Sequence, residues 1–204
     1  MNPLPKSPFP PYLALFIDNP VRRLLIDRER YLRERGVKEG DHVLEVGCGP
    51  GFFTEVLSRI VGEQGRVYAQ DVEEGMVRRV KRKLKRFDCR NVELLLCNST
   101  AIELPDDSCD VAFCANVFEE IYKEGELAGS VKDIDRVLKR GGILIIKEHR
   151  PGGTRKIIEE TIRLLIGKGY SIIGREETLL SLHIRLIKGS AGEGGVNEGY
   201  ESPG

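Results

Sequence analysis

Apolar residues are arranged along this chain in two alternating patterns. Short apolar runs that suit buried strands cover residues 43–46, 66–70, 92–96, 110–114, 143–146, 170–174 and 182–187. Between several of them, apolar residues recur every three or four positions, which predicts helices over residues 52–60, 74–87 and 154–166, and helical sequence up to residue 139. Alternating strands and helices require a sheet that is covered on both faces. We therefore predict an α/β, Rossmann-like three-layer sandwich around a mostly parallel, seven-stranded sheet.

The two ends of the chain follow different patterns. Residues 1–11 are rich in proline, and Asn19-Pro20 then has the signature of a helix start, with a helix reaching about Glu34. The last two predicted strands have a short connection, so we expect the last strand to run antiparallel to its neighbour. Residues 189–204 are rich in Gly, Glu and Ser and lack a hydrophobic pattern. We therefore expect an N-terminal extension with lid helices (1–40), an α/β domain (41–188) and a disordered tail (189–204).

Composition narrows the classes of partner. Lys and Arg number 32 and Asp and Glu number 32, so no global charge directs the chain toward nucleic acid or an acidic membrane. The five cysteines form no C-x-x-C pair, and we expect small buried residues in a reducing compartment rather than metal ligands. The apolar run from Tyr12 to Ile17 is too short for a signal peptide or a membrane span. We expect a cytoplasmic protein with no membrane partner.

The clearest chemical signal is the segment from Val43 to Gly51, in which an apolar strand enters a glycine-rich turn that opens a helix. Glycine permits positive φ angles and close approach of the backbone to a ligand, and N–H groups at a helix start can bind an anionic group. A dinucleotide fingerprint, G-x-G-x-x-G, needs a third glycine where this chain has Phe52 or Thr54. The spacing therefore argues against a nicotinamide dehydrogenase.

The pattern Glu45-x-Gly-x-Gly-x-Gly51 resembles the first motif of the class I S-adenosylmethionine-dependent methyltransferases of the small-molecule type. The resemblance extends over about residues 40–148 and implies S-adenosylmethionine as cofactor. It places the methionine end of the cofactor over the glycine loop, with Glu45 near the amino group, and the N-terminal helices (residues 12–35) as a lid over the substrate pocket. The loop residues that it assigns to the cofactor are Gly47, Cys48, Gly49, Gly51 and Phe52.

Two further motifs extend the predicted cofactor site. Asp71 ends the second strand about 20 residues beyond the loop, the spacing of a ribose-binding carboxylate, although it could also be a helix N-cap. By resemblance, Val72 and Met76 are apolar contacts to adenine. Asn98 stands where many relatives carry an adenine-binding Asp; its amide oxygen can accept a hydrogen bond. Ser99 and Thr100 are equally plausible partners of the adenine edge.

The fourth strand ends in Asn116-Val117-Phe118-Glu119, which is similar to the strand that lies beneath the transferable methyl group in small-molecule methyltransferases. The resemblance implies that Asn116 and Val117 line the cofactor. An acceptor O or N atom can need a base, and the candidates are Glu119 and His149. The Asn/Asp-Pro-Pro-Tyr/Phe motif of enzymes that methylate nucleic-acid amino groups is absent from the sequence.

The methyl acceptor remains open at this point. We expect a small molecule, because the chain is short and carries no appended recognition domain. The basic segment 78–86 keeps apolar residues at helical spacing, so we interpret its charges as a solvated face and do not expect nucleic acid as a partner. The alternatives are an RNA or protein methyltransferase and a non-catalytic S-adenosylmethionine-binding subunit. The oligomeric state is expected to be a monomer or a homodimer.

Overall fold

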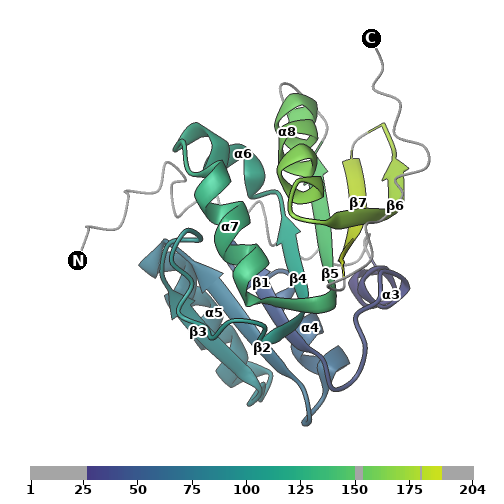
Figure 1. The fold of residues 1–204 in the computed structure, drawn as a ribbon. Helices are drawn as coiled ribbons and strands as arrows, with labels where there is room; N and C mark the ends of the chain where they lie inside the picture. The colour runs from purple at the N-terminus through teal and green to yellow at the C-terminus, as the bar shows by residue number, and fades with distance from the viewer. Residues whose placement is uncertain (1–26, 150–153, 180, 190–204) are drawn as a thin grey trace.

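The computed structural model describes residues 27–149, 154–179 and 181–189, in which seven strands form one sheet with helices on both faces (Figure 1). The sheet has the order β3-β2-β1-β4-β5-β7-β6. Its strands are β1 (His42–Val46), β2 (Arg66–Asp71), β3 (Val92–Leu96), β4 (Cys109–Ala115), β5 (Leu138–His149), β6 (Tyr170–Glu177) and β7 (Ser181–Lys188). The helices are α3 (Arg28–Glu34), α4 (Thr54–Val61), α5 (Glu74–Arg86), α6 (Phe118–Lys123), α7 (Leu127–Val137) and α8 (Thr154–Ile166).

The strand directions confirm the predicted fold class. Strands β1 to β5 pair in parallel, whereas β7 is antiparallel to both β5 and β6 and lies between them. The carboxyl ends of β1 to β5 therefore meet at one edge of the sheet, which is where open α/β sheets bind ligands. We call this the carboxyl edge.

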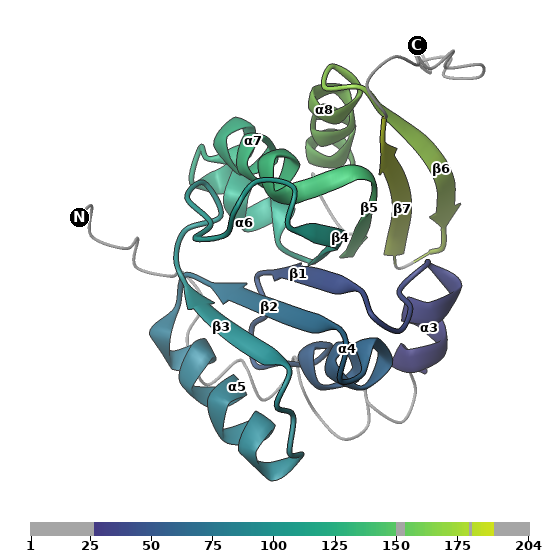
Figure 2. The same cartoon turned by 60° about the horizontal axis from the view of Figure 1, so that its bottom comes forward.

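Two layers of helices cover the sheet (Figure 2). Successive side chains of a strand point to opposite faces, so Val43 packs in the layer of α3, α4 and α5, while Leu44 packs in the layer of α6, α7 and α8. Both side chains are fully buried, as expected for a strand in the middle of a parallel sheet. The cysteines are free, and the prediction of burial is confirmed for Cys48, Cys97, Cys109 and Cys114.

Some predicted boundaries change. Strand β5 begins at Leu138 instead of Ile143, because Leu138 pairs with Cys109 before an irregularity in register. Gly141, with φ +74°, therefore lies inside the strand rather than before it. The helical sequence after β4 is divided into α6 and α7 by a turn at Gly125, whose φ is +72°.

Helix α3 begins at Arg28, and Asp27 before it is a non-helical N-cap whose side chain accepts the N–H of Arg30, so the prediction of one helix that runs from Asn19-Pro20 to about Glu34 is wrong. The helix start at Asn19-Pro20, most of the predicted lid (residues 12–26) and the tail from residue 190 lie outside the described residues. Leu32 of α3 is fully buried against the α4 side of the sheet. None of the described helices has the length and apolar character that crossing a membrane requires.

Candidate functional site

All the predicted cofactor residues lie at or just beyond the carboxyl edge, in the segments that follow four neighbouring strands. Glu45 lies within β1 and Asp71 is the last residue of β2. The others follow the strands: Gly47, Cys48, Gly49, Gly51 and Phe52 after β1, Val72 and Met76 after β2, Asn98, Ser99 and Thr100 after β3, and Asn116 and Val117 after β4. The fold thus brings together residues that are up to 72 positions apart in the sequence.

The glycine loop, residues 47–51, joins β1 to the start of α4. Gly47, Gly49 and Gly51 have φ angles of +65°, +52° and +76°, a region that other residues rarely adopt. A Cβ atom at Gly47 would lie 2.6 Å from Cγ2 of Val117, whereas one at Gly49 would meet nothing within 4 Å. Gly47 therefore permits the segment after β4 to pack closely, and Gly49 lies on an open side of the loop, where a ligand can approach the backbone.

Strand β2 holds this loop through two polar residues. Gln70 accepts the N–H of Cys48 at its carbonyl oxygen (2.8 Å) and the N–H of Gly47 at Oε1 (3.2 Å). Its side-chain Nε2 donates to the carbonyl oxygen of Cys97 after β3 (2.6 Å). Gln70 is 1% exposed, and sequence reasoning missed it. The available signal was a polar residue inside an otherwise apolar strand run.

Asp71, the next residue, bonds the loop directly. Its Oδ2 accepts the N–H of Gly49 (2.8 Å), and its Oδ1 accepts the N–H of Glu73 just before α5 (2.9 Å). Burial raises the pKa of this carboxyl group, although the two N–H bonds act in the opposite direction. A carboxylate has about four acceptor positions, so Asp71 retains acceptor capacity for a ligand.

Glu45 lies beneath the loop and is 3% exposed. Thr54 donates its hydroxyl to Oε2 of Glu45 at 2.6 Å. Burial raises the pKa of Glu45 to about 8, and the Thr54 bond and the charge of Lys83 oppose this only in part. A carboxyl group with such a pKa gains its charge readily when a cation arrives, which suits a site for an ammonium group.

Two cations hold the outer side of the loop. Nζ of Lys83, on α5, donates to the carbonyl oxygen of Gly51 and lies 3.7 Å from Glu55. Arg28 donates to the carbonyl oxygen of Phe52 at 2.5 Å. The Lys83 side chain is 10% exposed. The prediction that the charges of segment 78–86 form a solvated face is therefore wrong for Lys83, which sequence periodicity could not distinguish from its neighbours.

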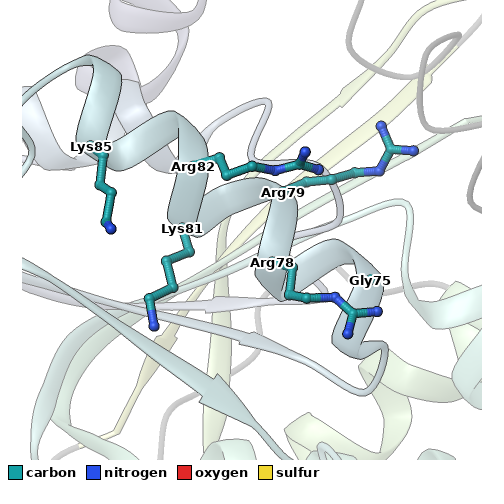
Figure 3. A pocket seen from close by; sticks show the side chains of 6 residues that line it. All are labelled: Gly75, Arg78, Arg79, Lys81, Arg82 and Lys85. Carbon is teal, nitrogen blue, oxygen red and sulfur yellow. The ribbon is translucent and has the colours of Figure 1, made fainter.

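The other cations of α5 do form an outward face. A hollow on this helix is lined by Gly75 and by five cations whose side chains extend away from the helix axis, Arg78, Arg79, Lys81, Arg82 and Lys85 (Figure 3). Met76, Val80 and Leu84 are buried beneath them, as the helical spacing predicts. Of the lining cations, Arg78 pairs with Glu74 on the same helix (2.9 Å).

Two of the residues predicted at the adenine edge are bonded to α7 or to Glu126, its N-cap residue. Nδ2 of Asn98 donates to both carboxylate oxygens of Glu126 (2.9 and 2.8 Å), and its Oδ1 accepts from the N–H (2.9 Å) and the hydroxyl (3.1 Å) of Thr100. The hydroxyls of Ser99 and Ser130 share a buried hydrogen bond of 2.7 Å. Contact of Asn98 with adenine stays a prediction, and it requires this amide to exchange one of its protein partners.

The segment after β4 has an unusual backbone. Asn116 has φ +55°, and its N–H donates to the carbonyl oxygen of Lys147 (2.7 Å). Its Oδ1 is buried without a hydrogen-bond partner in the described part of the chain. Buried amide oxygens normally accept a hydrogen bond, so this atom fits a ligand donor.

Glu148, near the end of β5, holds the same segment. Its Oε1 accepts the N–H groups of Val117 (2.9 Å) and Phe118 (3.0 Å), and the residue is 2% exposed. Burial raises its pKa to about 7, although the two N–H bonds lower it. Sequence reasoning singled out the neighbouring His149 instead. The available signal was a carboxylate that continues the buried run of β5.

The two candidate bases lie at the same edge. Glu119, on α6, has a side chain that is 47% exposed and pairs with Lys123 at 3.0 Å. His149, the last residue of β5, is exposed and stands opposite Ser181 of β7 in the sheet register. His183 is a different case: its ring accepts or donates hydrogen bonds with Tyr31 (2.9 Å) and Ser181 (2.7 Å), and burial lowers its pKa to about 4.

In sequence and in fold, the chain is similar to known methyltransferases. A family model described as a methyltransferase domain matches residues 44–146. The crystal structure of a SAM-dependent methyltransferase from Aquifex aeolicus is 32% identical, with a TM-score of 0.77 over 88% of this chain and 98% of that one. The PH0226 protein from Pyrococcus horikoshii, at 19% identity and a TM-score of 0.73 over 88% of this chain and 99% of that one, shares the fold.

Among curated proteins, the ubiquinone/menaquinone biosynthesis C-methyltransferase UbiE of Escherichia fergusonii is 30% identical over 147 residues. The match covers 72% of this chain and 56% of that relative. The chain therefore spans little more than half the length of the curated relative.

Proposed function

The chain belongs to the family of S-adenosylmethionine-dependent methyltransferases, and on this premise we propose that it transfers a methyl group from the cofactor to a small-molecule acceptor at the carboxyl edge. The observation that carries the proposal is the glycine loop, which is open at Gly49 and in which Asp71 accepts the N–H of that glycine. A non-catalytic S-adenosylmethionine-binding subunit is the second candidate, since it would need the same loop.

The polar side chains at the carboxyl edge suit the polar groups of the cofactor. Glu45 would face the ammonium of the methionine end, since a nearby cation favours its charged form. Asp71 would accept the ribose hydroxyls with the lone pairs that its N–H bonds leave available. The unpartnered Oδ1 of Asn116 offers a further acceptor. The remaining residues proposed to line the cofactor are Gly47, Cys48, Gly51, Phe52, Val72, Met76, Asn98, Ser99, Thr100 and Val117.

When bound, the cofactor supplies an electrophilic methyl group on a sulfonium. The chain then has to align the acceptor for in-line attack and keep water out, and orientation alone contributes about 7–11 kcal/mol in favourable cases. An acceptor that loses a proton needs a base, and we propose Glu119 or His149 because both lie at the carboxyl edge. Glu119 would have to exchange its partner Lys123 for the acceptor.

We propose the class of methyl acceptor from the curated relative. The printed name of the curated relative is that of a C-methyltransferase of quinone biosynthesis, so phenolic and quinone precursors are the first small molecules to test. RNA or protein as acceptor stays an alternative, because α5 carries an outward cationic face. We also propose that the N-terminal segment, residues 12–35, acts as a lid over the substrate pocket. Truncation before Asp27 should then abolish turnover and leave cofactor binding, whereas full activity of the truncated chain would exclude the lid.

The first experiment is calorimetric melting with S-adenosylmethionine, S-adenosylhomocysteine or NAD at millimolar concentration. A ligand that binds the folded state raises the melting temperature by mass action, so we expect a rise with the first two and none with NAD. Methyl transfer from labelled cofactor to a panel of acceptors then separates an enzyme from a binding subunit. A rise with NAD alone, or with no ligand, would contradict the proposal.

A further inference from the structure

We infer that Glu148 is a positioning residue, which holds the segment Asn116–Phe118 against the glycine loop and thereby sets the shape of the cofactor site. The inference rests on the proposed function, because it assigns a task within that site. It goes beyond the predicted lining residues, since Glu148 lies beneath the segment and acts through the backbone.

The carboxylate of Glu148 contacts the backbone at the start of α6. One carboxylate oxygen accepts two successive N–H groups, those of Val117 and Phe118, at 2.9 and 3.0 Å. These groups belong to the start of α6, where a helix leaves its N–H groups without internal partners. The two N–H bonds favour the charged form of this carboxyl group against the effect of burial, and they are stronger in that form. Glu148 therefore fixes where α6 begins relative to β5.

The segment Asn116–Phe118 in turn contacts the glycine loop. Val117 packs so closely on Gly47 that a Cβ atom there would lie 2.6 Å from its side chain. Asn116, one residue earlier, adopts a φ of +55°, which is uncommon for a residue other than glycine. Such a backbone persists when its surroundings fix it, and here two neighbouring residues of β5 do so: the Lys147 carbonyl oxygen accepts the N–H of Asn116, and the Glu148 carboxylate accepts the next N–H, that of Val117.

Glu148 is a carboxylate at a buried position, which needs a physical reason. A buried charge is unfavourable unless it is paired or hydrogen-bonded, and an apolar residue of similar size would be easier to bury. The ionisable groups around Glu148 are Lys147 on its own strand, Glu119 on α6 and Cys114 on β4. Replacement by an apolar residue would leave two N–H groups buried without an acceptor. The carboxylate is thus suited to holding this one backbone segment.

The experiment measures the dissociation constant of S-adenosylhomocysteine by isothermal titration calorimetry. The variants are E148Q, which keeps an acceptor oxygen; E148M, which keeps the length and removes it; V117A; and the double variant E148M/V117A. L165A, a truncation in the buried face of α8, is the control for loss of stability alone. Melting temperatures identify any variant that is unfolded at the temperature of the titration.

We expect E148Q to bind within about threefold of the wild type, because it still offers an acceptor, and E148M to bind about tenfold more weakly. If Glu148 acts through Val117, the double variant should bind about as tightly as whichever single variant binds more weakly, because the effects of coupled residues do not add. L165A should melt at a lower temperature with unchanged affinity. Should E148M not fold, E148D replaces it, because its shorter side chain withdraws the carboxylate from the two N–H groups.

Wild-type affinity for E148M, or for E148D where it replaces E148M, would overturn the inference, as would losses that multiply in the double variant. Failure of the wild-type chain to bind S-adenosylhomocysteine would instead contradict the proposed function. The two failures are therefore distinguishable in one set of titrations.

Discussion

The carboxylate of Asp71 accepts the backbone N–H of Gly49 at 2.8 Å, so the end of β2 fixes the turn that follows β1. Two motifs that are 22 residues apart are thereby one structural unit. The same carboxylate accepts the N–H of Glu73 and so also fixes the entry to α5. Asp71 is not the N-cap of α5, a position that Glu73 occupies; its carboxylate bonds the backbone of both turns, and its contact with the ribose stays a prediction.

Substitution of Asp71 by Asn tests this unit. Asn has one acceptor oxygen for two N–H donors and turns its own NH2 group toward one of them, so we expect a loss of about 1–3 kcal/mol in the free energy of unfolding. Affinity for S-adenosylhomocysteine should fall by about tenfold or more. The matched control is D110N, because Asp110 bonds the N–H of His42 at the opposite edge of the sheet. Equal loss of affinity in both variants would show that Asp71 acts through stability alone.

The raised pKa of Glu45 predicts how stability depends on pH. Its pKa is about 8 in the folded chain against 4.5 in the unfolded chain, so between these values the folded state binds more protons. The free energy of unfolding therefore decreases as pH rises through this window, and the stability that the neutral carboxyl provides is lost at higher pH. We expect the urea concentration at the midpoint of unfolding to decrease as the pH is raised from about 5 to about 8, and to decrease less in E45Q. Buried Asp71 and Glu148 contribute in the same direction in both proteins, so the difference between the two isolates Glu45. Identical pH slopes would contradict the prediction.

Much of this site could be predicted from the sequence because its signals are local. The glycine spacing of 47–51, the carboxylate at Asp71 and the strand runs each depend on a few neighbouring residues. Gln70, Lys83 and Glu148 were missed because their roles depend on contacts with residues 23 or more positions away. The position of β7 between β5 and β6 is likewise a property of the assembled sheet, which the length of a connection does not determine.

The glycines of the loop differ in what a side chain would meet. Alanine at either Gly47 or Gly49 costs about 1–2 kcal/mol because both have positive φ. G47A also forces the new methyl group into Val117, so we expect a further loss of about 1–3 kcal/mol from overpacking. The double variant G47A/V117A should recover part of this further loss, measured by urea unfolding. G49A should instead weaken cofactor binding more than its stability loss accounts for. Equal effects of G47A and G49A on both measurements would contradict this assignment.

Two lysines of α5 allow a matched test of the bond between Lys83 and the glycine loop. Lys83 is almost enclosed and donates to the carbonyl oxygen of Gly51, whereas Lys85 lines the outward cationic face of α5. Methionine keeps an unbranched side chain that is one atom shorter than that of lysine, and it removes the charge. K83M leaves that carbonyl and the nearby Glu55 without the cation, so we expect a loss of about 1–3 kcal/mol in unfolding free energy and weaker binding of S-adenosylhomocysteine. K85M should change stability by less than about 0.5 kcal/mol, as surface substitutions usually do. A stability loss in K85M that equals that of K83M would mean that the helix needs its total charge, rather than one lysine, to hold the loop.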